Sequence, residues 1–482
     1  MVTMKDYTTT VGLEIHAELK TRSKMFCPCA NNPHHAEPNA LVCPICMGHP
    51  GTLPTINKEA VKSVLKVGRA VKGTLADFTE FDRKNYFYPD IPKGYQISQY
   101  KYPLITGGQL AGVAITRIHL EEDTASSGHD EGDYSLVDFN RAGVPLMELV
   151  TEPVIHSPAE AGAFGRELQL LLRYLGVSDA HMEKGEMRVE ANISVSKTST
   201  FGTKVEVKNL NSFKAVERAI AYETERHIDM LERGEKIVQE TRGWDDSTQK
   251  TYSQRKKEDS HDYRYFPDPD LPKLYISQIP EYDEKILAKE TPELPSEKRV
   301  RFARDYGIKA EDIELFVTEP VVGDFFERVV TDLAGKKEST VLASNYITSD
   351  LLGLMKKKYG EGKITQGFSE LPFVPSLFAS LISMVEKGDI SSRGAKDILS
   401  VMFTEGGSPE DIAQARGLKQ KSDPAALKKI AQTIIENNPS VVAEYKAGKQ
   451  NLLQFFVGQA MKASGGSANP AVLQGVFKEL LS

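Results

Sequence analysis

The arrangement of the cysteines constrains this chain more than any other feature of its sequence. The four cysteines form two tight pairs, Cys27-Pro28-Cys29 and Cys43-Pro44-Ile45-Cys46, separated by residues 30–42. Two such pairs can bring four thiolates to one tetrahedral Zn²⁺ ion. Because all four positions are cysteine, no coordination site remains for a reacting water, so we expect a structural zinc knuckle over residues 27–46. The alternative is a set of four unrelated buried thiols.

Size and composition exclude several classes of protein. A chain of 482 residues indicates two to four domains, and 40% hydrophobic with 26% charged residues is typical of a soluble protein. The net charge of −7 argues against a chain coated with nucleic acid, although it leaves room for a local basic surface. The sequence holds no run of about 18 apolar residues and no apolar signal core, and its thiols are grouped. We therefore expect a cytoplasmic protein that does not enter a membrane.

The pattern of apolar residues changes along the chain. Strand-like alternation dominates the first part, whereas helical periodicity and proline punctuation prevail after about Thr291. Helix start and stop signals are clear where Ser157-Pro158-Ala159-Glu160 forms a capping box and Gly176 ends the helix behind it. The pattern predicts an α+β chain with a β-rich domain over 1–291, an all-α domain over 292–406 and a small all-α tail over 407–482.

Four predicted strands have an apolar face and an opposite face rich in acceptors. The polar faces carry Glu14 and His16, Glu148, Glu190 with Asn192, and Glu206 with Lys208. Carboxylates gathered on one sheet face repel each other unless cations lie among them, and Mg²⁺ prefers carboxylate and phosphate oxygens. This pattern predicts a metal–nucleotide site, with a solvated sheet face as the alternative. Neither a P-loop nor a Rossmann glycine motif is present.

Aromatic and basic residues alternate between Phe81 and Tyr100, and Lys84 is one of these basic residues. Such interleaving suits stacking on an unpaired RNA end, or else describes half-buried aromatics of a hairpin. The tail carries more Lys and Arg than Asp and Glu, unlike the chain as a whole. Its basic side chains either meet phosphates or cover solvated helices.

Several motifs together identify a resemblance. The segments at 11–16, 81–90, 119–123, 207–213, 262–267 and 455–462 resemble the B subunit of the aspartyl/glutamyl-tRNA amidotransferases. The resemblance extends from near residue 11 to the C-terminus. The cysteine quartet is similar to that of the zinc-containing branch of this family.

The resemblance implies a fold and a reaction. The β-rich domain is then a cradle that holds a kinase site, and a helical domain and a tail that meets tRNA follow it. ATP phosphorylates the side-chain carboxylate of Glu-tRNA(Gln) or Asp-tRNA(Asn), and ammonia displaces the phosphate. The A subunit, an amidase, supplies the ammonia from glutamine, and the small C subunit makes the complex a heterotrimer.

The resemblance also implies roles for individual residues. Family Mg²⁺ ligands correspond to Glu14, His16, Glu122, Glu148 and Glu206. With Lys208 these form the expected catalytic set, whereas Glu190, Asn192 and Lys84 are expected to bind the cofactor. Strict alternation from Ile118 and Leu120 places Glu122 on the apolar side, so the assignment requires a turn or bulge at Glu121.

Two other classes of function are compatible with these features. One is a catalytically silent, zinc-stabilised scaffold that binds tRNA. The other is an unrelated zinc-stabilised RNA-binding protein. ATP hydrolysis in the presence of misacylated tRNA distinguishes the enzyme from both.

Overall fold

The computed structural model describes residues 6–128, 132–256, 263–360, 362–420, 424–464, 468 and 470–481, so Asp262 of the 262–267 motif lies outside it. The chain divides into two compact units, Met1–Leu294 and Pro295–Ser482. The first is built around a large sheet and the second from helices. This confirms the coarse prediction of a sheet-rich N-terminal part followed by a helical C-terminal part.

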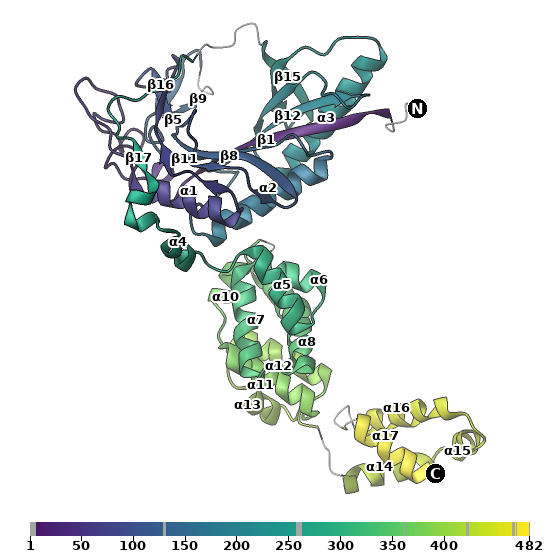
Figure 1. Cartoon of the computed structure of the whole chain (residues 1–482). Helices are drawn as coiled ribbons and strands as arrows, with labels where there is room; N and C mark the ends of the chain where they lie inside the picture. The colour runs from purple at the N-terminus through teal and green to yellow at the C-terminus, as the bar shows by residue number, and fades with distance from the viewer. Residues whose placement is uncertain are drawn as a thin grey trace. The chain divides into compact units, whose positions relative to one another are not determined.

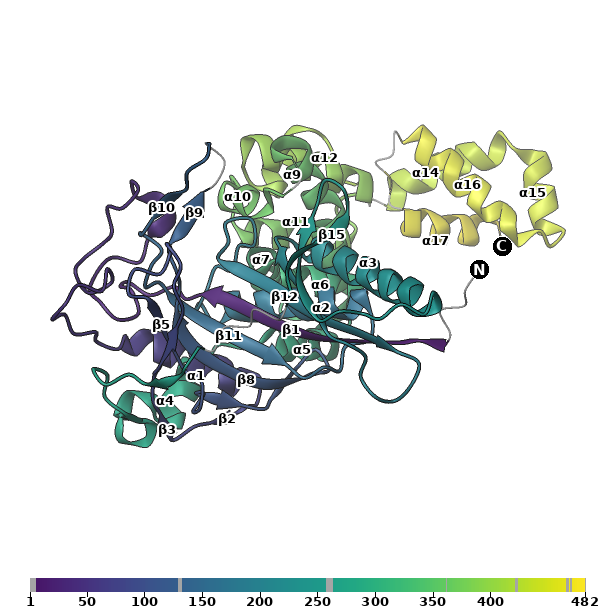
Figure 2. The same cartoon turned by 90° about the horizontal axis from the view of Figure 1, so that it is seen from above.

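A 13-stranded sheet forms the first unit, and β1 lies at its centre between β12 and β11 (Figure 2). Neighbouring strands are antiparallel except for β13 and β14, which are parallel. In spatial order the strands are β15 (Lys250–Lys256), β14 (Glu240–Asp245), β13 (Val205–Leu210), β12 (Met187–Ser196), β1 (Thr8–Glu18), β11 (Pro145–Thr151), β8 (Val113–Glu122), β5 (Tyr95–Ser98), β4 (Asp82–Asn85) and β16 (Phe266–Pro267).

Short strands complete this unit. β6 pairs with both β8 and β2, and β7 pairs with β8. Two further pairs, β9 with β10 and β3 with β17, are separate two-stranded sheets. Their bounds are β2 (Thr74–Leu75), β3 (Phe78–Thr79), β6 (Ile105–Thr106), β7 (Gln109–Leu110), β9 (Ser126–Gly128), β10 (Leu136–Asp138) and β17 (Leu274–Tyr275).

The sheet is curved, and helices cover its convex side (Figure 1). These helices are α1 (Lys58–Ala70), α2 (Pro158–Tyr174) and α3 (Phe213–Glu232), with α4 (Glu284–Glu290) near the end of the unit. Ser157 and Glu160 form the predicted capping box at the start of α2, and Gly176 beyond its end has φ +66°. Local signals in the sequence therefore set the bounds of α2.

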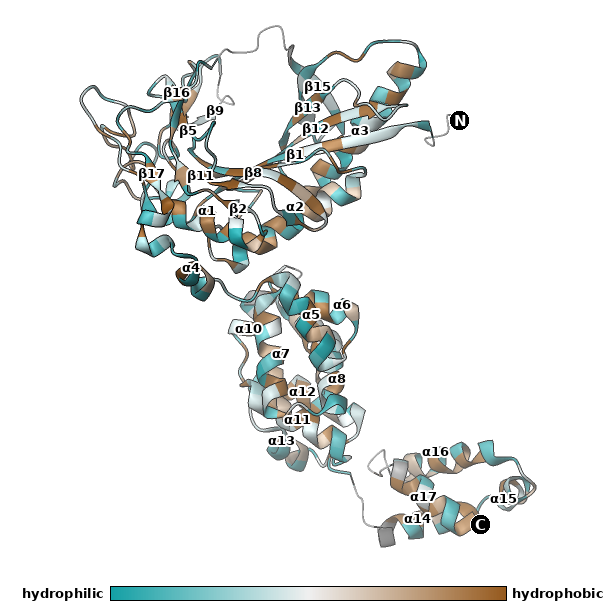
Figure 3. Cartoon of the chain, in the orientation of Figure 1, coloured by the Kyte–Doolittle hydropathy of each residue, from teal (hydrophilic) through white to brown (hydrophobic). Residues whose placement is uncertain are grey.

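The core lies between the convex side of the sheet and these helices. Leu13 and Ile15 of β1 are buried, as are Val64 of α1 and Phe164 of α2. Figure 3 shows hydrophobic residues in the strands of the sheet and in the helices α1 and α2. Full burial of each such side chain contributes about 1.5–3 kcal/mol, which fixes the register of the strands and hence the residues on the opposite, concave face.

The second unit holds two groups of helices. The first group comprises α5 (Pro295–Tyr306), α6 (Ala310–Thr318), α7 (Pro320–Asp332), α8 (Lys337–Asn345), α9 (Leu352–Tyr359), α10 (Ile364–Ser369), α11 (Pro375–Lys387), α12 (Ser392–Glu405) and α13 (Pro409–Ala415), with a π-helix at Tyr346–Leu351. The second group comprises α14 (Pro424–Glu436), α15 (Pro439–Lys446), α16 (Leu453–Ala463) and α17 (Pro470–Leu481).

The second group of helices has an apolar cluster of its own, which includes Leu427, Phe456 and Phe477. This cluster supports a separate tail, and the boundary between residues 406 and 407 stays a prediction. Among the residues that the structure describes, no helix is both long and apolar enough to cross a bilayer.

Candidate active site

The polar faces of the predicted strands meet on the concave side of the sheet. In the register of the central strands, His16 lies opposite Glu148 of β11 and Glu14 lies opposite Glu190 of β12. Asn192 of β12 in turn lies opposite Glu206 of β13. Because side chains alternate along each strand, residues two apart in sequence share this face. Strands far apart in sequence thus contribute to one cluster of carboxylates, which we call the acidic cluster.

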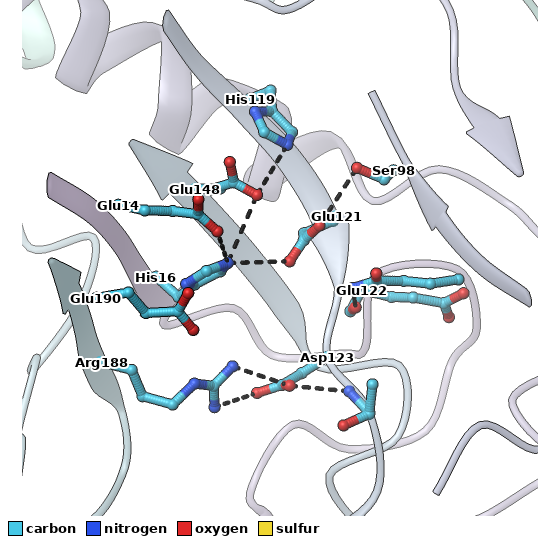
Figure 4. Close-up of polar contacts among 12 residues, drawn as sticks. Glu14, His16, Ser98, His119, Glu121, Glu122, Asp123, Glu148, Arg188 and Glu190 are labelled. Atoms are coloured by element: carbon cyan, nitrogen blue, oxygen red, sulfur yellow. Dashed lines mark hydrogen bonds and ion pairs between the residues drawn. The ribbon is translucent and has the colours of Figure 1, made fainter. Parts of the chain in front are cut away.

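His16 stands in the middle of the acidic cluster (Figure 4). Its Nε2 atom lies 3.5 Å from Glu148 Oε2, 3.7 Å from Glu14 Oε1 and 3.7 Å from Glu121 Oε1. One atom of each of Glu14, His16 and Glu148 lies within 4.8 Å of the others, and the same holds for His119, Glu121 and Glu148. Glu148 is therefore shared by two groups that each have the composition of a metal site.

The pKa values of these groups reflect their crowding. Burial, together with the charges of Glu148 and Glu190, raises the pKa of Glu14 to about 7. Burial opposes the charged form of His16, but the hydrogen bond to Glu148 and the charge of Glu121 nonetheless raise its pKa to about 9. Despite its own burial, Glu148 has a pKa well below its usual range because His119 and His16 lie beside it. Without a bound cation, the acidic cluster thus keeps a net negative charge. Partial protonation of Glu14 lowers the repulsion among its carboxylates.

The other end of the acidic cluster contains a lysine. Lys208 Nζ lies 2.8 Å from Glu190 Oε2 and 3.7 Å from Glu206 Oε1. Burial lowers the pKa of Lys208, but Glu190 and Glu206 outweigh burial and raise it. Glu14, Glu190 and Glu206 form a third group whose ligand atoms lie within 4.8 Å of one another. The Oδ1 atom of Asn192 is buried there and has no hydrogen-bond partner among the residues that the structure describes.

Glu122 does not join the acidic cluster. From Arg117 to its end, β8 pairs with β11 in unbroken register, with Glu121 opposite Leu146 and Glu122 opposite Pro145. Regular alternation therefore places Glu121 beside His16 and turns Glu122 to the other face. There the carboxylate of Glu122 pairs with Lys93 and accepts a hydrogen bond from the Ile97 N–H at 2.9 Å. The pairing leaves no room for a bulge at Glu121, which corrects the expected position of the Glu122 side chain.

Glu122 and Lys93 instead line a cavity of about 220 Å³. Cys27 and Cys46 are among its other lining residues, so this cavity lies between the cysteine loop and the back of β8. Glu121 and Glu122, although adjacent on β8, therefore face two different sites, the acidic cluster and this cavity.

Two residues of the cluster, His119 and Glu121, were not among the site residues predicted from the sequence. Both belong to the 119–123 motif, and their spacing of two was the signal that places them on one face. His119 Nε2 lies 3.4 Å from Glu148 Oε2, and Arg117 contacts the other oxygen of Glu148 at 3.3 Å. On the border of the cluster, Arg188 makes two hydrogen bonds to Asp123, at 2.9 and 3.0 Å (Figure 4).

Lys84 lies outside the acidic cluster. Its Nζ atom is 4.9 Å from the centre of the Tyr263 ring and 5.6 Å from that of Tyr86. Such contacts are cation–π interactions. The structure therefore places Lys84 among aromatic side chains next to β4 rather than among the carboxylates.

The four cysteines gather as predicted. Their sulfur atoms lie within 4.8 Å of one another. The Cys43 N–H donates to Cys46 Sγ at 3.1 Å, and the buried Lys24 Nζ lies 4.0 Å from the same sulfur. A hydrogen bond from Cys27, the Cys43 N–H and the charge of Lys24 together lower the pKa of Cys46 to about 5, although burial opposes this shift. This arrangement suits a thiolate-bound metal.

The donor atoms of the two sites suit different ions. Carboxylate oxygens, which predominate in the acidic cluster, are the ligands that Mg²⁺ or Mn²⁺ prefers, whereas four sulfurs favour Zn²⁺. The pKa of Glu14 is raised, and the buried Nδ1 atoms of His16 and His119 have no hydrogen-bond partner within the described part of the chain. The polar groups of the acidic cluster therefore do not satisfy one another. The residues present therefore fit a bound cation at both places.

Two family models match this chain. The GatB/GatE catalytic domain matches residues 9–280, and the GatB domain matches residues 324–481. The chain is 42% identical over 501 residues to the B subunit of the aspartyl/glutamyl-tRNA(Asn/Gln) amidotransferase of Crocosphaera subtropica, covering 99% of this chain and 98% of the relative. The same subunits of Thermodesulfovibrio yellowstonii (44% over 485 residues, 98% and 99% covered) and Moorella thermoacetica (45% over 489 residues, 99% and 100% covered) are similar to the same extent. The chain belongs to the B-subunit family of the aspartyl/glutamyl-tRNA(Asn/Gln) amidotransferases.

Proposed function

We propose that this chain is the part of a tRNA-dependent amidotransferase that activates and amidates the amino acid of misacylated Glu-tRNA(Gln) or Asp-tRNA(Asn). The convergence of Glu14, His16, Glu121, Glu148 and Glu206 on the concave sheet face carries this proposal. Membership of the family and coverage of the whole chain by its relatives support it. The expected partners are the amidase (A) and small (C) subunits of a heterotrimer, together with the tRNA.

The reaction has two steps. A side-chain carboxylate oxygen of the aminoacyl group attacks the γ-phosphorus of ATP, and the bond from that phosphorus to the ADP oxygen breaks. The nitrogen of ammonia then attacks the acyl carbon, phosphate leaves, and the nitrogen loses a proton. The product is an amide, which makes Gln-tRNA or Asn-tRNA.

The acidic cluster explains how two anions meet in the first step. Glu14, His16, Glu148 and Glu206 are four of the five predicted Mg²⁺ ligands, and the position of Glu121 supports its inclusion in place of Glu122. Bound Mg²⁺ supplies positive charge that offsets the phosphates. Lys208 lies at one end of the cluster, where its raised pKa keeps it charged, and it suits stabilisation of the transferring group. Glu190 and Asn192 lie beside it as candidate nucleotide contacts.

The cysteine loop has a different role in this proposal. Four sulfur ligands fill the coordination of Zn²⁺, so this ion stabilises the loop over residues 27–46 and takes no part in the transfer. Buried Lys24, which donates to the Ala142 carbonyl at 2.7 Å, offsets the negative charge of the thiolates.

The test combines the chain with its amidase and small partners, ATP, glutamine and each misacylated tRNA in turn. We expect the amino acid released from the tRNA to be converted to its amide. Glu206→Ala is expected to lower ATP-dependent amidation at least about 100-fold while tRNA binding persists, because it removes a carboxylate from the cluster.

Glu281→Ala is the matched control, since Glu281 is an exposed carboxylate paired with Lys58 outside the cluster. The scaffold alternative predicts no ATP hydrolysis in the complete complex with misacylated tRNA. Normal amidation by Glu206→Ala would remove the assignment of the acidic cluster.

A further inference from the structure

Five tyrosines form a connected group of rings beside the acidic cluster. The tyrosine cluster comprises Tyr86, Tyr88, Tyr100, Tyr263 and Tyr265. Adjacent rings have centroids 6.0 Å apart for Tyr86 and Tyr88, 5.8 Å for Tyr86 and Tyr263, and 6.0 Å for Tyr263 and Tyr265. The rings come from the segments that adjoin β4, β5 and β16, three strands that pair with one another through β4.

Tyr100 and Tyr265 differ from the other pairs in their geometry. Their rings are stacked, with centroids 4.1 Å apart and planes 11° from parallel. Tyr100 is 62% exposed, although Tyr265 covers one face of its ring. The second face of Tyr100 is thus open to another flat ring, and the stack behind it fixes its orientation.

The position of Tyr100 links it to the acidic cluster. Tyr100 follows the end of β5 by two residues, and Ser98 at that end lies opposite Glu121 of β8. The Ser98 hydroxyl donates to Glu121 Oε2 at 3.3 Å (Figure 4). Two residues of chain span at most about 7 Å. A nucleoside stacked on Tyr100 therefore lies close enough for an acyl group on its ribose to extend toward the carboxylates.

Basic side chains accompany the tyrosine cluster. Lys84 lies over Tyr86 and Tyr263, and Lys101 Nζ lies 5.1 Å from the centre of the Tyr102 ring. These lysines contrast with the carboxylates on the neighbouring strands. Aromatic faces with adjacent cations are the recurring surface for single-stranded nucleic acid, in which bases stack and phosphates meet the charges.

Two adenine bases are candidates for stacking on Tyr100, the base of ATP and the terminal base of the tRNA. The exposure of the Tyr100 ring decides between them. Small-molecule pockets enclose most of their ligand's surface. The Tyr100 side chain is 62% exposed, so it does not enclose the base of ATP in this way. An unpaired RNA end, by contrast, stacks its bases on exposed aromatic rings. The exposed ring thus favours the terminal base of the acceptor strand over the base of ATP.

We infer that Tyr100, supported from behind by Tyr265, is the stacking platform for the 3′-terminal base of the misacylated tRNA. This inference rests on the proposed function and adds a substrate-binding residue to it. The stacked base holds the esterified amino acid over the acidic cluster, and Lys84 meets the backbone of the same strand end. None of these residues belongs to the predicted metal ligands.

Steady-state kinetics of the complete complex test this inference. Tyr100→Ala is expected to raise the KM for misacylated tRNA about 5- to 150-fold, which corresponds to ~1–3 kcal/mol per stacked base, and to leave the KM for ATP unchanged. Tyr100→Phe keeps the ring and is expected to retain the wild-type KM. Because Asp82 Oδ2 accepts the Tyr100 N–H at 3.1 Å through the backbone, removal of the exposed ring leaves this contact in place.

A second measurement uses tRNA that lacks its terminal nucleotide. Loss of that nucleotide is expected to weaken tRNA binding by the wild-type complex but not to weaken it further in Tyr100→Ala, because the platform and its base act as a pair. Tyr275→Ala is the control, since Tyr275 is 45% exposed and lies against Phe78 outside the cluster.

Two outcomes would overturn the inference. One is an unchanged KM for tRNA in Tyr100→Ala, and the other is a raised KM for ATP alone, which would assign the ring to the base of ATP. In both cases the wild-type complex still forms the amide, so the proposed function stands. Absence of amide formation by the wild-type complex would instead remove the proposed function itself.

Discussion

The acidic cluster and the cysteine loop are both groups of potential metal ligands, but they are assembled in different ways. The four cysteines come from residues 27–46, one continuous segment. The acidic cluster takes its ligands from β1, β8, β11, β12 and β13, which span more than half of the first unit. One site therefore needs only a local turn, whereas the other exists only after the whole sheet has formed.

This difference in assembly matches a difference in chemistry. The cysteine loop offers sulfur alone and leaves no position for a substrate. The acidic cluster offers oxygens and imidazoles around a shared Glu148, so phosphate oxygens can complete its coordination. The group with open coordination positions is therefore built on the sheet, and the group without them is built within a loop.

The two glutamates at the end of β8 give the largest expected effect. Glu121→Gln is expected to weaken Mn²⁺ or Mg²⁺ binding about 10- to 100-fold and to lower amidation at least as much, because Glu121 lies beside His16. Glu122→Gln is expected to leave ion binding unchanged, because Glu122 pairs with Lys93 on the other face. Titration calorimetry of the free chain with each ion measures the affinities.

The reverse result would restore the family-based assignment. If Glu122→Gln weakened ion binding and Glu121→Gln did not, the regular alternation of β8 would be a poor guide to its metal-bound form. A loss of amidation in Glu122→Gln with normal ion binding would point instead to the cavity that Glu122 and Lys93 line.

Removal of zinc is expected to have an intermediate effect. Cys43→Ala leaves three of the four sulfurs, so we expect the zinc content to fall from about one ion per chain to a small fraction of that. Amidation at low temperature is expected to persist in part, because the acidic cluster does not depend on the loop for its ligands. Metal analysis by mass spectrometry and activity at two temperatures measure both effects.

Ser63→Ala in α1 is a suitable control for Cys43→Ala, because Ser63 is buried in the same unit and its hydroxyl donates to the Glu59 carbonyl of its own helix. Retention of zinc in Cys43→Ala would contradict a four-sulfur site. Complete loss of ion binding at the acidic cluster would show that the two sites depend on each other.

A buried carboxylate outside both sites gives the smallest expected effect on activity. Glu223 of α3 accepts hydrogen bonds from Arg226 at 2.7 Å and from Thr251, and Arg242 Nε lies 3.3 Å away. Burial opposes its charge, yet His227, Arg226 and Thr251 lower the pKa of Glu223 to about 2. Because the lowered pKa favours the ionised form in the folded state, this stability is present above pH about 4.5 and is lost as the pH falls through about 2.

Glu223→Gln is therefore expected to lower the free energy of unfolding at pH 7 by about 3 kcal/mol, with a smaller difference from wild type below pH about 4.5. Fluorescence of Trp244, the single tryptophan, reports urea unfolding in the adjoining strand β14. Glu225→Gln, an exposed change on the same helix, is the control. A difference that stays constant down to pH 3 would contradict the lowered pKa.

Alternation of side chains made much of the acidic cluster predictable from the sequence. It placed Glu14, His16, Glu148, Glu190 and Glu206 on one side of their strands, and the structure brings them together. The capping box predicted the start of α2, and the spacing of the cysteines predicted their meeting. Each of these signals depends on a few neighbouring residues.

What the sequence did not reveal depends on distant contacts. The expectation for Glu122 came from resemblance, and the strand periodicity that opposed it agrees with the structure. In the tyrosine cluster, Tyr100 stacks on Tyr265, which lies more than 150 residues away in the sequence. No local sequence pattern predicts that stack. β13 and β14 pair in parallel because helix α3, which packs against the sheet, connects them.

The alternation along β1 limits how this protein can vary. Glu14 and His16 lie on the concave face of the sheet, while Leu13 and Ile15, the residues that flank Glu14, fill the core. Inserting or deleting a single residue would exchange the two sets, so that charges would enter the hydrophobic interior and aliphatic groups would replace the ligands. We therefore expect β1 to tolerate substitutions of single residues but not insertions or deletions that shift its register.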